Sequence, residues 1–340
     1  MESKVDPTKD ILADVTSENA EPYREFWRQA LAVQGSIMMH VLPNVILSGV
    51  VATIVCFIAY YLKQNHSFQI GFNVSLYEVV GGALGLLLVL RTNAGYDRWW
   101  EGRKLWGGIV NQSRNLCINA LSYGPNEPEW RSKFVRWVAV FGHVSRMRLR
   151  NETESPEVTN LIGEQSAQEL FKTEHMPSAV SMMLGGMLKD ACDRGLMTEP
   201  AFLQAEQERA KLIDHLGACE RILRTPLAMA YSVKIRQFIA LFILTLPFAL
   251  VNSLGAYWQV PLLTMMVAYP LLSLDQLGVE LQNPFSTKNL SHLPLAEISK
   301  AIEKNVLSLL RAKSVKSGDL DFKVREQKRT EELISFLNKS

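Results

Sequence analysis

The chain has 340 residues, of which 48% are hydrophobic and 21% are charged. Its 36 Lys and Arg are nearly balanced by 34 Asp and Glu, and the resulting net charge of +2 argues against a nucleic-acid-binding protein. The four cysteines are scattered without a CxxC pair, which argues against a zinc site or a disulfide framework. We expect the apolar and charged residues to be segregated into blocks.

The N-terminal segment, residues 1–25, is polar and acidic and is expected to be cytoplasmic. It has neither the apolar core of a secretory signal nor the Arg-rich, acid-poor composition of a transit peptide. Its role is left unassigned.

A first transmembrane hairpin is predicted over residues 26–90, with apolar runs at 37–62 and 76–90 joined by "KQNHSFQIGFNVS". A helix needs about 20 residues to cross a bilayer, and only the first run reaches that length by itself. The second run contains Gly81 and Gly85, a GxxxG pattern typical of close helix packing in lipid.

The stretch "RTNAGYDRWWEGRKLWGG" follows the second run at once, from Arg91 to Gly108. Its charges fall at i,i+3 and i,i+4 spacings, which indicates that the helix continues past the membrane. We expect Trp99, Trp100 and Trp106 to act as anchors near the headgroups, where amphipathic rings are favoured.

Residues 91–234 are predicted to form a helical cytoplasmic region. The clearest amphipathic helix has an apolar stripe that consists of Trp130, Phe134, Trp137, Val138 and Phe141. No segment alternates polar and apolar residues long enough to require a strand.

A second transmembrane hairpin is predicted over 235–277, with apolar runs at 238–254 and 260–274 joined by "GAYWQ". Residues 278–311 are expected to form a cytoplasmic C-terminal helical region, and 312–340 a charged tail.

Charge predicts the orientation of both hairpins. Their tips hold one formal cation, Lys63, whereas the opposite ends are flanked by Arg24, Arg28, Arg91, Arg98, Arg103, Lys104, Lys234 and Arg236. By the positive-inside rule, the chain is a multi-pass protein of the cell membrane with both termini in the cytoplasm.

Signatures of enzymes and cofactor sites are not apparent. The six histidines have no HxxxH or HExxH spacing, and neither a phosphate-binding glycine motif nor GxSxG occurs. We therefore predict no catalytic residue, no metal and no cofactor.

Three motifs resemble the bestrophin family in its prokaryotic branch: "RTNAGYDRWWEGRKLWGGIVNQSRNL" at 91–116, "CERILRTPLAMAY" at 219–231 and "ELQNPF" at 280–285. The resemblance covers roughly residues 26 to 311. It implies an all-α, homopentameric ion channel with four transmembrane helices per subunit and a pore on the fivefold axis.

The same resemblance implies a pore neck formed by Gly82, Leu86 and Leu90, and a cytoplasmic aperture at Leu227. A spacing of four keeps the neck residues near one helix face. Gly82 stands where relatives have a bulky residue, so we expect a wider pore there. Glu78 is a possible pore-entrance charge, with an interfacial or intersubunit-paired residue as the alternative.

In the calcium-activated animal members of the family an acidic cluster follows Asn-Pro-Phe. Here the segment reads "NPFSTKNLSHLPL" and contains no carboxylate. Because Ca²⁺ usually requires carboxylate oxygens, we expect no calcium clasp at this place.

The leading hypothesis is a channel for small monovalent ions, with anions such as chloride favoured. One alternative is a channel selective for monovalent cations. A second alternative, from another class, is a membrane-anchored helical scaffold without conductance. An enzyme is the least supported interpretation.

Overall fold

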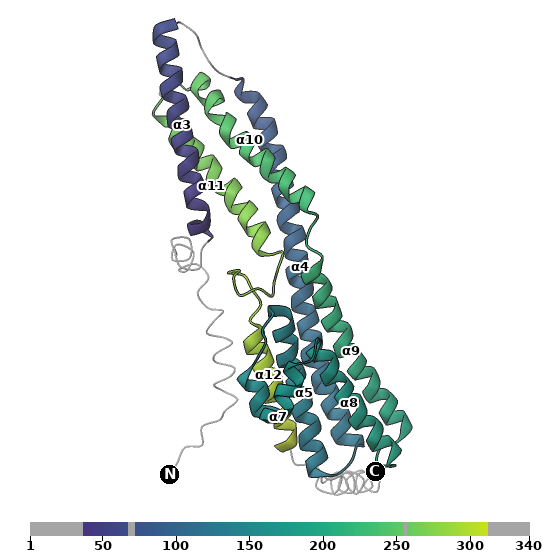
Figure 1. Cartoon of the computed structure of the whole chain (residues 1–340). Coiled ribbons are helices and arrows are strands. Elements are labelled where there is room, and N and C mark those ends of the chain that lie inside the picture. The colour runs from purple at the N-terminus through teal and green to yellow at the C-terminus, as the bar shows by residue number, and fades with distance from the viewer. Residues whose placement is uncertain (1–36, 67–71, 255–256, 312–340) are drawn as a thin grey trace, which may run out of the picture. The chain divides into compact units, whose positions relative to one another are not determined.

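The computed structural model describes residues 37–66, 72–254 and 257–311. Every regular element within these ranges is a helix, which confirms the expected all-α fold (Figure 1). The N-terminal segment 1–25 and the charged tail 312–340 lie outside the described residues.

In the part of the chain that the structure describes, four helices are long and apolar enough to cross a membrane. They are α3 (Met38–His66), α4 (Val74–Tyr123), α10 (Met229–Ser253) and α11 (Gln259–Glu280). Helices α10 and α11 extend beyond the apolar runs at 238–254 and 260–274, because polar flanking residues are also helical. The two runs that seemed short in the sequence therefore lie in helices of 25 and 22 residues.

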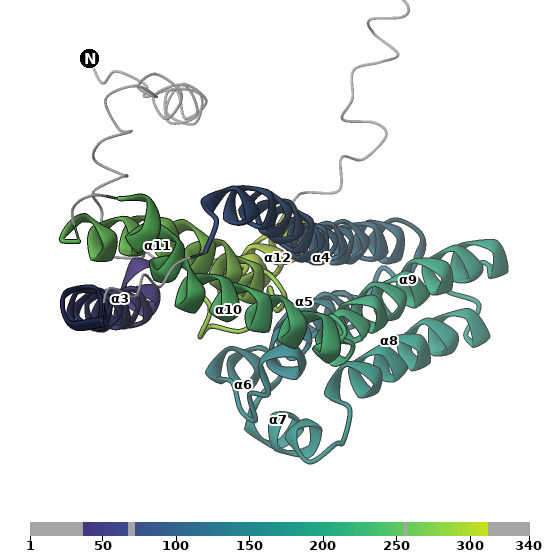
Figure 2. The ribbon, with the colours of Figure 1, turned by 90° about the horizontal axis from the view of Figure 1, so that it is seen from above.

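The helices fall into two compact units. The first unit comprises the described residues up to Asp97, together with Leu227–Gln282 and Lys288–Ser291. Within it, α3 lies beside α11 and also contacts α10 (Figures 1 and 2). Gly49 marks the closest approach of α3 to α11, because a Cβ there would lie 2.5 Å from the sulfur of Met265.

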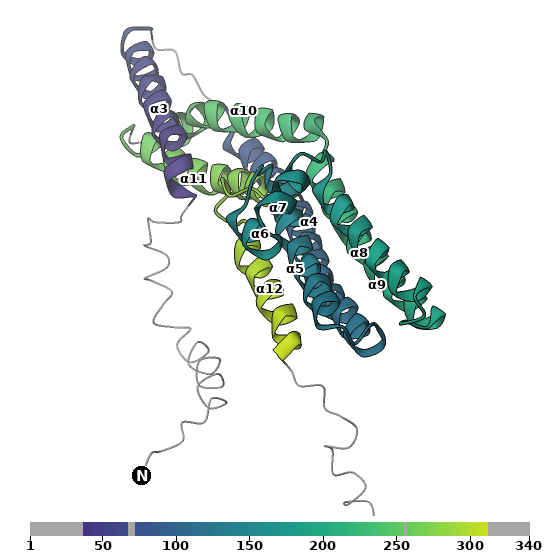
Figure 3. The same ribbon diagram turned by 60° about the horizontal axis from the view of Figure 1, so that its bottom comes forward.

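The second unit comprises Arg98–Pro226, Asn283–Thr287 and the described residues from His292 to Arg311. It therefore contains the C-terminal part of α4, which is continuous from Val74 to Tyr123. Its other helices are α5 (Pro128–Arg150), α6 (Pro156–Ile162), α7 (Glu164–Phe171), α8 (Met176–Asp193), α9 (Glu199–Arg224) and α12 (Leu295–Arg311). Helix α5 is central: α12, α8, α6 and α9 all contact it (Figure 3).

The predicted apolar stripe of α5 is confirmed, since all five of its residues are buried in the core of the second unit. The expectation for Trp106 was wrong. This side chain has no exposed surface and belongs to the same core, so it packs inside protein instead of anchoring the chain at headgroups. Trp100, in contrast, is largely exposed.

The continuity of α4 past Arg91 confirms the expectation that this helix does not end with its apolar run. The division of the chain at residues 90, 234, 277 and 311 stays a prediction. The two units are separated instead at Asp97, at Pro226 and around the Asn-Pro-Phe loop, because they follow packing contacts.

Candidate functional site

The predicted neck residues lie on a face of α4 that the subunit leaves uncovered. Leu86 is 63% exposed and Leu90 is 53% exposed, although both are large apolar side chains. Gly82 is exposed too, and a Cβ built on it would meet no atom within 4 Å. Val79 is 73% exposed and lies on the same face. We call Val79, Gly82, Leu86 and Leu90 the open face of α4.

The opposite side of α4 is buried. Leu84 and Leu88 pack with Ile235, Ile239 and Phe242 of α10 in an apolar cluster. At about 100° per residue, Leu88 lies roughly 160° around the helix from both Leu86 and Leu90. Packing against α10 therefore fixes the rotation of α4 that leaves its open face uncovered.

Val79 was missed in the sequence, although its position could have been found. It lies seven residues before Leu86, which is about two helical turns. Residues spaced by four, such as Gly82, Leu86 and Leu90, shift gradually around a helix. Residues spaced alternately by three and four stay on one face. Glu78 is exposed, but it lies about 80° from Leu86, toward one side of the open face.

Charged residues of both signs continue the line of the open face along α4. Asp97 and Lys104 are exposed, and they lie about three and five turns beyond Leu86. Because one is a carboxylate and the other an ammonium, they add no net charge to this face of the helix. The open face alone therefore does not decide between cations and anions.

Leu227, the predicted aperture residue, lies in the short connection between α9 and α10 and is half-buried. The end of α9, just before it, is attached to α4. Arg98 donates to the carbonyl oxygens of Ile222 and Thr225, and the Arg221 guanidinium pairs with Glu101 at 3.0 Å. A cation at the last carbonyls of a helix is favoured by the helix dipole.

Three charged residues of the first unit form a cluster, in which Arg91 and Asp275 are buried and Arg236 is exposed. Arg91 of α4 pairs through Nη1 with Oδ1 of Asp275 on α11. Arg236 of α10 donates from Nε to Oδ2 of the same carboxylate at 3.0 Å. The side chain of Arg91 is only 1% exposed, so this residue is not the solvated boundary charge that the sequence suggested. We call Arg91, Asp275 and Arg236 the charged triad.

The Asn-Pro-Phe loop is held by a protein cation. Arg150 donates to the carbonyl oxygens of Phe285 at 3.2 Å and of Leu293 at 3.1 Å. The loop also closes on itself, because the Leu293 amide donates to the Pro284 oxygen at 2.7 Å. Two backbone carbonyl oxygens of this loop are thus bonded to a guanidinium. Burial lowers the pKa of Arg150, although Glu152 acts in the opposite direction.

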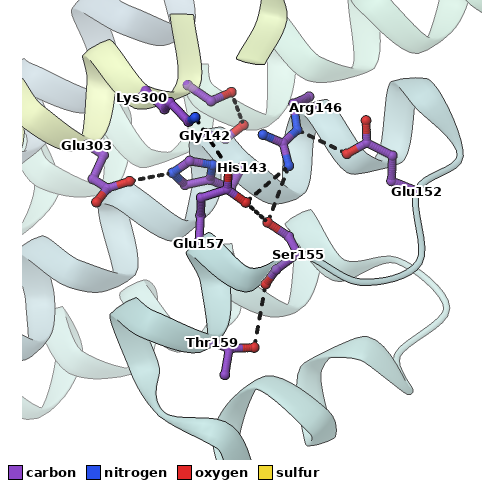
Figure 4. Close-up of polar contacts among 10 residues, drawn as sticks. Gly142, His143, Arg146, Glu152, Ser155, Glu157, Thr159, Lys300 and Glu303 are labelled. Atoms are coloured by element: carbon purple, nitrogen blue, oxygen red, sulfur yellow. Dashed lines mark hydrogen bonds and ion pairs between the residues drawn. The ribbon is translucent and has the colours of Figure 1, made fainter. Parts of the chain in front are cut away.

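A second ionic cluster joins α12 to α5 and α6 (Figure 4). His143 Nε2 lies 2.8 Å from a carboxylate oxygen of Glu303, and Lys300 lies 3.9 Å from Glu157. Since a carboxylate only accepts, Nε2 carries the proton, and the buried Nδ1 has no protein partner. Burial lowers the pKa of His143 below its ordinary value, although the Glu303 hydrogen bond opposes the shift.

On the other side of this cluster, Arg146 donates to Glu152 at 3.0 Å and to the Ser155 hydroxyl at 3.3 Å. That hydroxyl in turn donates to Glu157 at 2.7 Å and holds the pKa of Glu157 below its ordinary value. None of these pairs was predicted, since Glu152 and Ser155 lie in the connection between α5 and α6 and no local pattern marks them as partners of Arg146.

Comparison with known proteins gives the family. The model for the bacterial and fungal bestrophin proteins matches residues 18–308. The chain belongs to this family. A voltage-dependent anion channel-forming protein of Nostoc sp. is 32% identical over 306 residues, which cover 87% of this chain and 96% of that protein. The anion channel-forming protein YneE of Escherichia coli is 28% identical, with 85% and 92% of the two chains covered.

Solved structures agree with this assignment. A bacterial bestrophin homologue from Klebsiella pneumoniae superposes with a TM-score of 0.72 over 80% of this chain and 99% of the homologue, at 24% identity. A structure described as a membrane protein gives the same TM-score at 26% identity, with 81% and 98% of the chains covered. The chain therefore has the bestrophin fold, and its four apolar helices are those of a membrane protein.

Proposed function

We propose that this bestrophin is one subunit of a homopentameric channel that conducts small anions, chloride among them, through a pore lined by the open face of α4. The observation that carries the proposal is the uncovered line of apolar side chains on a helix whose other side is packed. An apolar face of this size needs lipid or other subunits to cover it. The names of the Nostoc and Escherichia coli relatives support anions as the permeant ions.

In the proposed pentamer, rings of Leu86 and Leu90 form the narrow part of the neck. Apolar rings of small diameter exclude water, and they gate a channel when the diameter changes. The ring at Gly82 has no side chain, so the pore widens there. Val79 adds an apolar ring on the outer side, while Glu78 lies beside the open face.

The aperture is assigned to Leu227, whose position follows from the attached end of α9. Arg98 and Glu101 hold that end on α4, and Leu227 follows it in the connection to α10. The calcium clasp of animal relatives is not part of the proposal, since Arg150 occupies the loop carbonyls.

The proposed location is the cell membrane, with both termini in the cytoplasm. The cations Lys234, Arg236 and Arg98 lie near the same ends of the spans, whereas Lys63 is near a hairpin tip. The positive-inside rule places the cation-rich ends in the cytoplasm.

Planar-bilayer recording in asymmetric KCl, together with the mass of the protein in detergent, tests the proposal. We expect a pentamer whose reversal potential follows chloride. Leu86→Ala should raise the single-channel conductance, because it widens the narrowest ring. Val80→Ala is the matched control, since Val80 is exposed on the same helix but lies about 120° from Leu86.

Each other outcome has a definite meaning. A reversal potential that follows potassium supports the cation-selective alternative and draws attention to Glu78. A non-pentamer without conductance supports the membrane-anchored scaffold. Equal effects of the two substitutions would show that the open face does not line the pore.

A further inference from the structure

The charged triad contains more positive than negative charge. Arg91 and Arg236 are two guanidinium groups, and they share the single carboxylate of Asp275. Oδ1 faces Arg91 and Oδ2 faces Arg236, so both carboxylate oxygens are already in use. No ion pair joins the other buried carboxyl of α11, Glu280, to this triad in the part of the chain that the structure describes. One positive charge per subunit therefore stays unbalanced.

Two members of the triad are buried and therefore screened little by solvent, whereas the side chain of Arg236 is 53% exposed. The side chain of Arg91 is 1% exposed and that of Asp275 is 11% exposed. Within Arg91, the buried Nε and Nη2 have no hydrogen-bond partner in the protein. Charges in a protein interior interact more strongly and over longer distances than charges in water, because the local dielectric constant is lower. Salt screens exposed charges within about 10 Å but buried ones much less.

The triad also lies at a particular level of α4. Arg91 directly follows Leu90, the last residue of the proposed neck, and points to the packed side of the helix. A helix with its side chains is about 10 Å across, so the guanidinium lies roughly that far behind the open face. The Arg91 side chain packs on α11 at Gly278, where a Cβ would lie 3.5 Å from Arg91 Nε, an ordinary contact distance.

We propose that the excess positive charge of the Arg91–Asp275–Arg236 triad sets the anion preference of the pore. Five copies surround the inner end of the neck and raise the potential there, where the open face has no charge of its own. A field from behind an apolar wall favours anions without giving them a binding site that would slow their passage. This inference rests on the proposed function, and it names the residues that determine selectivity.

A structural role predicts something different. If the triad only holds α4, α10 and α11 together, changing its charge should alter stability without altering which ion passes. A series of variants separates the two roles, because it changes the triad's net charge while leaving the open face untouched.

The central variant is Arg236→Gln, which removes the excess charge and leaves the Arg91–Asp275 pair intact. Arg236 is 53% exposed, so the substitution places no new unpaired group in the interior. Arg236→Lys keeps the charge and is the first control. Lys234→Gln is the second, because it removes an exposed cation of the same helix that pairs with Gln237 and not with the triad. Asp275→Asn increases the excess to two charges.

The experiment measures reversal potentials of each purified variant in asymmetric KCl. We expect Arg236→Gln to lower the chloride-to-potassium permeability ratio about twofold or more. Arg236→Lys and Lys234→Gln should remain near the wild type, and Asp275→Asn should raise the ratio. If Asp275→Asn does not assemble, the two Arg236 variants decide the question.

Two results would overturn the inference. A permeability ratio that is the same in Arg236→Gln and the wild type shows that the triad's charge does not act on the pore. An equal loss in Arg236→Gln and Arg236→Lys shows that geometry matters instead of charge. A silent wild type contradicts the proposed function and this inference with it, whereas an anion-selective wild type with an unresponsive triad contradicts the inference alone.

Discussion

The two units of the molecule bury their apolar residues to very different extents. The second unit has one large core, which extends from Trp106 on α4 through the whole of α5 to Val306 on α12. The first unit has two small clusters, and many of its large apolar side chains are exposed. Among the four candidate spans, α4 is the least buried: its membrane-length window is only 17% buried, compared with 44% for α10.

This contrast distinguishes residues that stabilise the subunit from residues whose contacts lie outside it, with lipid, the pore or other subunits. In the second unit, an apolar side chain usually packs against others of the same chain. In the first unit, the open face of α4 finds no partner in its own subunit. Substitutions should therefore change folding stability in the second unit, and assembly or conductance on the open face.

The largest effect is expected for Phe141→Ala. Phe141 has no exposed surface and lies in the core of the second unit. Removing a buried aromatic ring costs about 3–5 kcal/mol, so the melting temperature in detergent should fall by many degrees. Phe57→Ala is the matched control, because Phe57 is exposed on α3 and should change stability by less than about 0.5 kcal/mol. Similar losses for both variants would contradict the comparison.

A smaller, pH-dependent effect is expected at His143. Its pKa is lower in the folded protein than in the unfolded chain, so the folded state binds fewer protons. The stability that it contributes is present above the unfolded value of about 6.5 and is lost as the pH falls below it. The protection of α12 amides against hydrogen exchange, measured relative to their intrinsic exchange rates, should therefore fall on acidification from pH 7.5 to 5.5.

The control for this effect is His143→Gln, an amide that can still donate to Glu303 but does not titrate in this range. This variant should flatten the pH dependence of the protection of α12 amides against hydrogen exchange. An unchanged pH dependence in this variant would place the titrating group elsewhere. Glu303→Gln should loosen α12 at every pH by about 1 kcal/mol, since it replaces a charged acceptor by a neutral one.

Gly82→Leu should have almost no effect on stability but should reduce conductance. A Cβ at Gly82 would meet no atom within 4 Å in its own subunit, and in the proposed pentamer a leucine there restores a third bulky ring. Its neighbour provides the contrast: at Gly81 a Cβ would lie 3.2 Å from the ring of Phe242, so Gly81→Leu should lower the melting temperature. A conductance that is unchanged in Gly82→Leu would remove Gly82 from the neck.

The smallest effect is expected for Lys189→Gln. Lys189 forms an i,i+4 pair with Asp193 on the surface of α8, and both side chains are mostly exposed. Water and salt screen such a pair, so the melting temperature should not change measurably. A clear shift would show that this surface of α8 is covered in the assembled protein.

The sequence predicted the parts of this fold that depend on local pattern. Apolar runs located the four spans, and the five stripe residues of α5 are all buried, although residues 137–147 of this helix are buried on every side. The resemblance to the bestrophin family pointed to Gly82, Leu86 and Leu90, which are all exposed on α4, and their role in a neck stays a prediction. The role of Arg91 itself was not predictable, because its partner Asp275 lies 184 residues away and nothing local marks the pair.

The same reason explains the other misses. Trp106 was expected near headgroups because it follows two tryptophans and several charges, but helix packing in the second unit buries it. His143 and Glu303 are 160 residues apart, and Arg150 reaches a loop that begins more than a hundred residues later. Such contacts depend on how the helices pack. Helix packing leaves no local pattern in a single sequence.

The sequence of α4 also has a mechanical consequence. Helices α3, α10 and α11 each contain an internal proline, at Pro43, Pro247 and Pro270, whereas the 50 residues of α4 contain none. A helix with an unbroken hydrogen-bond ladder resists sharp bending. Between Leu86 and Leu90 the rod has no glycine either, so this segment is torsionally stiff. If the neck widens, Leu86 and Leu90 should therefore move in concert as α4 tilts or rotates. One ring would not open without the other.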